Sequence, residues 1–183
     1  GLTIVAQKGT PAIQAIATTV ETYHSDLGEH AFALMASHQQ SLKYDVVHDN
    51  QRFDINYWIL QKEVDHLRWV EEMSEAIAEE REFLAEVDPT QCSFGQWFYS
   101  YDVDDPLLMK ILKKVESPHE ELHHLGEKIN TTDGKPQRQA IHDNEVIPTL
   151  NAIKAVFREF SAYVMPVITE ARNNTQTHMD ALE

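Results

Sequence analysis

His119 and His123 form a pair whose residue type and spacing suit metal binding. Residues four positions apart lie on one face of a helix, so two imidazoles at this spacing can share one ion. Zinc favours four nitrogen or sulfur ligands in a tetrahedron. The pair alone is a weak signal because many surface or core histidines share the spacing. A zinc site therefore needs further ligands from other parts of the chain.

Cys92 is the single cysteine, so no intrachain disulfide can form and the thiol needs another explanation. It follows Asp88-Pro89, a predicted helix N-cap with proline at the first helical position. The positive end of a helix dipole there would favour the thiolate, the form that binds metal. The alternative is a small buried apolar residue, which is the commoner state of an isolated cysteine. Gly95 predicts close packing nearby, because glycine weakens a helix by about 1 kcal/mol.

The elements that position these residues are predicted to be helices throughout, because strand signals are scarce. The capping and turn residues predict three long helices and, after Asp88, Asp105 and Ser117, three short ones. The long helices are expected at 10–42, 53–84 and 140–172, with Pro148 as a candidate kink in the last. We therefore predict an all-α fold, an elongated four-helix bundle with extra short helices around a zinc site.

His66 and His119 each lie on an apolar helical stripe and are expected to face the interior. The chain is long enough for one buried core, so we expect a single helical domain over residues 1–183.

Three sequence blocks together resemble a known family, the chemoreceptor zinc-binding domain. The family pattern is His-x-x-Trp, then Cys-x-Phe-Gly-x-Trp, then His-x-x-x-His. This chain reads His-Leu-Arg-Trp at 66–69, Cys-Ser-Phe-Gly-Gln-Trp at 92–97 and Pro-His-Glu-Glu-Leu-His at 118–123. The resemblance covers roughly residues 60–130. It implies that these residues are the zinc-binding portion of a single helical sensor domain over residues 1–183. It implies one zinc ion held by the following four residues: His66, Cys92, His119 and His123.

The resemblance also implies a sensory role, since the family is attached to bacterial chemotaxis receptors and diguanylate cyclases. We expect a zinc-binding input domain of a chemotaxis receptor that detects zinc or an oxidant. One alternative is a cytoplasmic zinc-sensing regulator of a diguanylate cyclase. A second is a di-iron, haemerythrin-like oxygen-binding bundle, although such sites need more histidines and bridging carboxylates. We expect no enzyme activity, because four protein ligands close a zinc site to substrate.

The charge of the chain and its flanking segments indicate which partners it can have. Thirty Asp and Glu residues against fifteen Lys and Arg give a net charge of −15, which argues against nucleic-acid binding. Besides the zinc ion, a homodimer is the expected partner. The flanks 1–60 and 135–183 are similar to the outer helices of extracytoplasmic chemoreceptor domains. This similarity implies a periplasmic domain of an inner-membrane receptor, touching the membrane only through flanking helices absent from this chain. A cytoplasmic location is the alternative.

Overall fold

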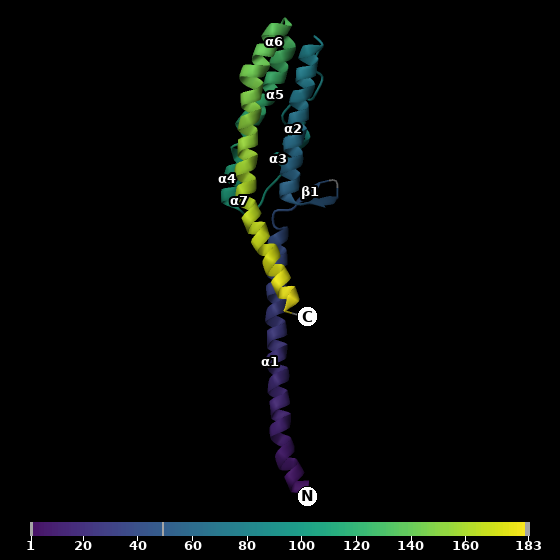
Figure 1. Ribbon diagram of the computed structural model, residues 1–183, viewed down its shortest axis with the longest axis vertical. Coiled ribbons are helices and arrows are strands. Elements are labelled where there is room, and N and C mark those ends of the chain that lie inside the picture. Colours follow the sequence, from purple (N-terminus) through teal and green to yellow (C-terminus); the bar gives the residue numbers. More distant parts are fainter. Residues whose placement is uncertain (1, 49, 182–183) are drawn as a thin grey trace. The chain divides into compact units, whose positions relative to one another are not determined.

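The computed structural model describes residues 2–48 and 50–181, with side chains described from Thr10 onward (Figure 1). The chain divides into two compact units. One unit consists of residues 44–166, and the other combines the segment up to Lys43 with the segment from Val167 onward. Each unit is built around helices, and the predicted all-α fold is confirmed. The single sensor domain over residues 1–183 stays a prediction.

The terminal unit pairs the helix α1 (Leu2–Leu42) with the end of the last helix, α7 (Ile147–Asp180). The rings of His30 and His178 lie 6.0 Å apart, which places these two segments against each other. The predicted start of α1 at Thr10-Pro11 is wrong, because Pro11 lies inside the helix. The helix continues upstream of the proline even though proline removes one backbone hydrogen bond.

A short β-hairpin opens the unit 44–166, and the sequence did not indicate it. Strand β1 (Val46–His48) pairs antiparallel with β2 (Gln51–Phe53), with Val46 opposite Phe53. Strands of three residues are too short to show the period-two pattern that identifies a strand. The hairpin is a small addition to an otherwise helical unit.

The helix α2 (Ile55–Ala78) carries His66 and begins at an N-cap. The Asp54 carboxylate accepts hydrogen bonds from the backbone N–H groups of Asn56 and Tyr57 at 2.8 and 3.3 Å. The helix ends earlier than the predicted Leu84, because Glu80 takes a positive φ of 57° that no helix accommodates.

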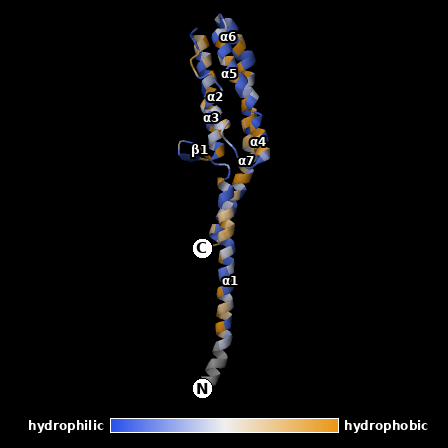
Figure 2. Cartoon of the chain, turned by 180° about the vertical axis from the view of Figure 1, so that it is seen from behind, coloured by the Kyte–Doolittle hydropathy of each residue, from blue (hydrophilic) through white to orange (hydrophobic). Residues whose placement is uncertain are grey.

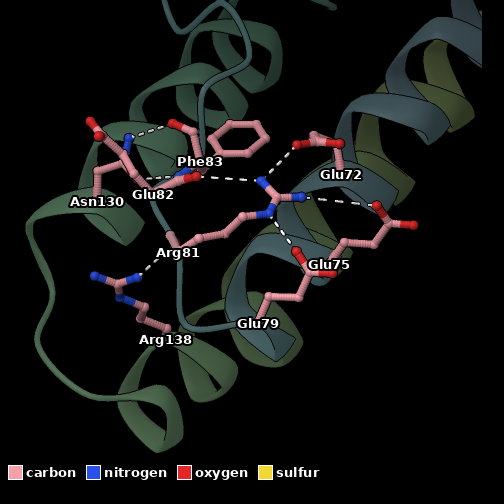
Figure 3. A network of polar contacts seen from close by, with 8 residues as sticks. All are labelled: Glu72, Glu75, Glu79, Arg81, Glu82, Phe83, Asn130 and Arg138. Atoms are coloured by element: carbon pink, nitrogen blue, oxygen red, sulfur yellow. Dashed lines mark hydrogen bonds and ion pairs between the residues drawn. The ribbon is translucent and has the colours of Figure 1, made fainter.

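Hydrogen bonds and ion pairs of two side chains hold the loop after α2 in place (Figure 3). Arg81 binds the carboxylates of Glu72 and Glu79 at 2.8 and 2.7 Å. Asn130 makes two hydrogen bonds to the backbone of Phe83, donating to its carbonyl at 2.8 Å and accepting from its N–H at 2.9 Å. The loop is therefore fixed at both α2 and the helix that carries Asn130.

The central helices follow in the predicted order, with two differences in where they begin. The helix α4 (Pro106–Lys113) begins after Asp105 as predicted, and the Asp105 carboxylate accepts the Leu108 N–H at 3.0 Å. The helix α3 (Ser93–Phe98) begins after Cys92 rather than after Asp88. The helix α5 (Glu116–Thr131) begins at Glu116, ahead of the predicted Ser117 cap.

The predicted last helix consists of three consecutive segments. They are α6 (Lys135–Ile141), the π-helix η1 (His142–Val146) and α7. The π-helix ends two residues before Pro148, whose missing backbone N–H removes one hydrogen bond of the α-helical ladder. A widened turn therefore lies beside the position at which the sequence predicted a kink.

The core of the unit 44–166 is formed by apolar side chains at helical spacing. Figure 2 shows how apolar and polar positions alternate along its helices. In α7, the buried residues recur every three or four positions: Leu150, Ile153, Phe157, Phe160 and Val164. Ion pairs join the helices at the surface, with Lys154 of α7 3.8 Å from Glu63 of α2. This core surrounds the histidines of the predicted metal site.

Candidate metal centre

His66 lies in α2 and presents one free nitrogen to the interior. Its ring is buried, and its Nδ1 is 2.6 Å from the carbonyl oxygen of Lys62. A carbonyl only accepts hydrogen bonds, so Nδ1 carries the proton and Nε2 keeps its lone pair. Nε2 is buried and has no hydrogen-bond partner in the described structure. A histidine whose other nitrogen is fixed to a carbonyl in this way is prepared for metal ligation.

Cys92 is the N-cap residue of α3, and its sulfur points back at the start of that helix. The Gly95 N–H donates to Cys92 Sγ at 3.2 Å. A Cβ at Gly95 would lie 1.8 Å from the carbonyl oxygen of Pro89, so only glycine fits there. The close approach predicted at Gly95 is therefore the contact between α3 and the turn at Pro89.

The thiol of Cys92 does not show the low pKa that the dipole argument predicted. Partial burial raises its pKa, and the backbone N–H groups of Gly95 and Phe94 offset only part of that rise. The helix that Cys92 caps has six residues, too short to build a large dipole. A metal cation is the charge that would favour the thiolate here.

His119 and His123 lie one helical turn apart in α5, and both are fully buried. Their ring centroids are 4.7 Å apart. The Nε2 of His119 is 3.3 Å from Cys92 Sγ, and the Nδ1 atoms of both histidines are buried without a hydrogen-bond partner in the described structure. The two imidazole rings therefore place nitrogen atoms close to the sulfur of Cys92.

Three of the four predicted ligands form a tight group among the described residues. The ligand atoms of Cys92, His119 and His123 all lie within 4.8 Å of one another. His66 falls outside that limit, although its ring centroid is 5.3 Å from that of His119. A cavity of about 50 Å³ has His66, Cys92 and His123 in its lining. The structure thus brings His66 to the edge of the group.

These residues fit a zinc ion on chemical grounds. Two ligands at usual zinc distances, about 2.3 Å for sulfur and 2.1 Å for nitrogen, lie roughly 3.6 Å apart in a tetrahedron, near the 3.3 Å found here. Burial lowers the pKa of His66 to about 4 and that of His119 to about 3, and it lowers the pKa of His123. The imidazoles are therefore neutral near pH 7, which is the form that binds metal.

The comparison with known protein families supports the same assignment. Residues 66–130 match the family model of the chemoreceptor zinc-binding domain. This segment belongs to that family. No curated protein and no solved structure matches the chain. The chemoreceptor zinc-binding domain is a zinc-binding module, so zinc is the metal of this centre. Which residues ligate it stays a prediction.

The tryptophan in the first block of the chemoreceptor zinc-binding domain anchors a loop beside the centre. Trp69 Nε1 donates to the carbonyl of Glu86 at 2.9 Å, and its ring packs 5.2 Å from that of His123. A Cβ at Gly126 would come within 3.0 Å of the Trp69 ring, so the small residue lets α5 approach α2. Trp69 thus packs against the centre and fixes the loop at Glu86.

Lys62 is a part of the centre that sequence reasoning missed. Its buried Nζ donates to Asp65 Oδ2 and to Ser93 Oγ, both at 2.9 Å, and lies 4.5 Å above the Trp58 ring. The ammonium therefore ties α2 to the start of α3, next to Cys92. Its position four residues before His66, on the same helical face, was the available signal.

Phe94 packs against the imidazole rings on the apolar side of the centre. Its ring lies 4.8 Å from that of His119 and 5.4 Å from those of His66 and Phe157. Because Phe157 belongs to α7, the aromatic contacts connect the centre to that helix. They hold the imidazole rings in fixed orientations and limit the access of water.

The periplasmic location expected from the flanking segments is wrong. The family match contradicts it, because chemoreceptor zinc-binding domains are cytoplasmic. The resemblance of the flanks to extracytoplasmic helices was a likeness of length and helical pattern, which many unrelated helices share. Within the described residues, we find no helix with the length and apolar character needed to cross a bilayer.

Proposed function

We propose that this chain is a cytoplasmic zinc-sensing module in which His66, Cys92, His119 and His123 hold one zinc ion. The observation that carries the proposal is the convergence of one thiol with two buried imidazoles, with His66 Nε2 at the edge of the group. The family match supports the metal and the cytoplasmic setting. His66 would supply the fourth ligand atom through its buried Nε2.

The ligand set gives the module its means of signalling. Its members come from α2, α3 and α5, so loss or oxidation of one ligand changes the packing of three helices. Cys92 is half-buried, and a thiolate is the ligand type that oxidants attack. The proposed cue is therefore zinc supply or an oxidant. The proposed output is an attached diguanylate cyclase or chemoreceptor signalling domain.

The same geometry favours binding over catalysis. Four protein ligands fill the tetrahedral sphere of zinc and leave no position for a reacting water. Among the described residues, the group of three or more candidate ligands contains no carboxylate, whereas di-iron centres bridge their metals with carboxylates. The proposed role is therefore zinc binding rather than catalysis or di-iron oxygen binding.

The proposed homodimer is supported by the apolar face of α1. Its members recur at alternating spacings of three and four residues, as in the seam of a coiled coil. They are the exposed side chains of Ile13, Ile16, Val20, Tyr23 and Leu27. Figure 2 shows apolar positions distributed along this helix. Pairing of two such seams would remove these side chains from water.

Metal analysis of purified variants tests the ligand assignment. We expect about one zinc per chain in the unmodified protein and none in the His119→Ala, His123→Ala double variant, because two of four ligands are lost. The control is His124→Ala, which removes an exposed histidine of the same helix. Stoichiometric zinc in the double variant contradicts the assignment.

For the oxidant cue, hypochlorous acid should release zinc in step with modification of Cys92. Retention of zinc at doses that oxidise methionine would exclude this cue.

A further inference from the structure

A second cavity, separate from the metal centre, lies in the unit 44–166. Its volume is about 680 Å³, within the range of small-molecule sites. The walls come from the end of α3, the following loop, α4 and the start of α5. Aromatic and apolar side chains form most of the lining, including Phe98, Tyr99, Tyr101 and Met109.

Lysines gather at this cavity although the chain as a whole is acidic. Lys110, Lys113 and Lys114 line it in a protein of net charge −15, and Glu116 is the acidic residue of the lining. Lys114 pairs with Glu159 at 2.6 Å. Lys110 and Lys113 are exposed, and among the described residues neither has a recorded carboxylate partner. Their place at the end of α4 complements the helix dipole, but that role does not account for the aromatic walls.

Tyr101 contributes an aromatic ring to the same lining. Its hydroxyl is buried and has no hydrogen-bond partner in the described structure, while its ring packs 4.9 Å from that of Trp97. Burial and the carboxylates of Asp105 and Asp45 raise the pKa of this hydroxyl, so it lies on the inner side of the residue and the ring is the part that the cavity presents. The cavity therefore combines aromatic and apolar walls with two available ammonium groups.

We propose that this aromatic-lysine cavity binds an amphiphilic organic anion. The ligand class has an aromatic or long apolar body and one acidic head group, a carboxylate or a sulfonate. The body packs against Phe98, Tyr101 and Met109, while Lys110 and Lys113 neutralise the head group at the rim. Apolar contact supplies affinity and the lysines supply selectivity for an anion.

The position of this cavity also gives its occupant a route to the metal centre, a step that rests on the proposed zinc ligation. Phe98 stacks on Phe94 with ring centroids 5.5 Å apart, and Phe94 contacts the ring of His119 at 4.8 Å. Glu116 of the lining is the first residue of α5, which carries His119 and His123. A ligand that shifts Phe98 therefore shifts the surroundings of the proposed ligands.

A matched pair of fluorescent probes tests the site on the zinc-loaded protein. The anion 8-anilinonaphthalene-1-sulfonate and the neutral N-phenyl-1-naphthylamine share one ring system and differ in the sulfonate. We expect the sulfonate to bind one saturable site per chain at least about tenfold more tightly than the amine. The Lys110→Gln, Lys113→Gln double variant should lose most of that preference and keep its affinity for the amine.

The control variant is Arg68→Gln, Arg158→Gln, which removes the same charge from two exposed positions outside the cavity. Equal affinity for the two probes, or equal weakening in both double variants, would overturn the proposal, because binding would then reflect general hydrophobicity or net charge. Both double variants change exposed side chains, so both should fold.

Zinc competition with a chelating dye measures the link to the metal centre. With saturating sulfonate probe, we expect the zinc affinity to change by about fivefold or more. An unchanged zinc affinity beside lysine-dependent probe binding would refute the link. A protein that binds the probe in this way but binds no zinc would instead refute the proposed function, so the two failures are distinguishable.

Discussion

The metal centre and helix α1 differ in which kind of group each leaves in an unfavourable environment. In the centre, nitrogens of His66, His119 and His123 are buried and have no hydrogen-bond partner among the described residues. In α1, apolar side chains stay in water, with Ile13 68% and Val20 60% exposed. An unpartnered buried polar group costs about 1–3 kcal/mol within the fold. An exposed apolar side chain forgoes about 1.5–3 kcal/mol that burial would provide.

The contrast separates two properties of the protein. A ligand for the buried nitrogens acts on the stability of the unit 44–166, because the unfolded chain has no preformed site. A partner for the apolar face of α1 acts on association, which depends on protein concentration. Variants and conditions that affect one region should therefore leave the other largely unchanged.

The largest expected effect is that of zinc removal on the metal centre. Structural zinc contributes about 10–16 kcal/mol in small zinc-finger peptides, and a unit with its own apolar core should lose less than that. We expect the thermal midpoint to fall by roughly 10 °C or more when a chelator strips the ion. Differential scanning calorimetry before and after re-addition of zinc measures the change. An identical midpoint in both states would mean that the centre is not coupled to folding.

Acid should destabilise the metal-free protein through the same histidines. Burial lowers the pKa of His66 to about 4 and of His119 to about 3, whereas an unfolded histidine titrates near 6.5. Between about pH 6.5 and 4 the unfolded chain therefore takes up protons that the folded chain does not. The stabilising contribution of the neutral histidines is fully present above this window. As the pH falls across the window, the free energy of unfolding decreases by up to a few kcal/mol.

Urea unfolding at a series of pH values measures this dependence. His66→Gln should flatten the slope below pH 6.5, because it removes one of the depressed groups. His24→Ala, which removes an exposed histidine of α1, is the matched control and should leave the slope unchanged. An equal effect of both variants would show that burial in the centre is not the cause.

Two glycines sharpen the comparison between the regions. Gly95→Ala places a Cβ 1.8 Å from Pro89 O, and backbone must move to relieve that contact. We expect a loss of about 3 kcal/mol and weaker zinc binding, because the Gly95 N–H also bonds Cys92 Sγ. Gly28→Ala meets no atom within 4 Å in α1 and should stabilise the helix by about 0.5–1 kcal/mol. Chemical denaturation and zinc titration of both variants test this difference in sign.

The parts of the structure that the sequence predicted are those with local signals. Proline after Asp105 marked the start of α4, and the apolar stripes placed His66 and His119 inside. The family pattern added Cys92 and His123, which spacing alone left open. For His66 and His119 the hydrophobic period alone was sufficient, because it does not depend on where each helix begins.

The parts that the sequence did not predict depend on contacts between distant segments. Cys92 as the cap of α3 depends on the turn at Pro89, and the placement of the loop after α2 depends on Asn130, 47 residues beyond Phe83. Lysine is usually a surface residue, and Lys62 is buried only because Asp65 and Ser93 accept hydrogen bonds from its ammonium group. Neither periodicity nor capping encodes such partners.

The smallest expected effect on the metal centre is that of a charge on the α1 seam. Val20→Asp places a carboxylate among Ile16, Tyr23 and Leu27, where a paired seam would bury it without a partner. We expect the proposed homodimer to dissociate into monomers at micromolar concentration, while zinc content and the unfolding of residues 44–166 stay unchanged. Thr19→Asp adds the same charge one position away from the seam, at an exposed site, and should leave the dimer intact. Sedimentation equilibrium with zinc analysis on the same samples measures both properties. If Val20→Asp leaves the molecular mass unchanged, the seam is not the dimer interface. If Val20→Asp also removes zinc, the metal centre and α1 are coupled, contrary to the prediction that they are independent.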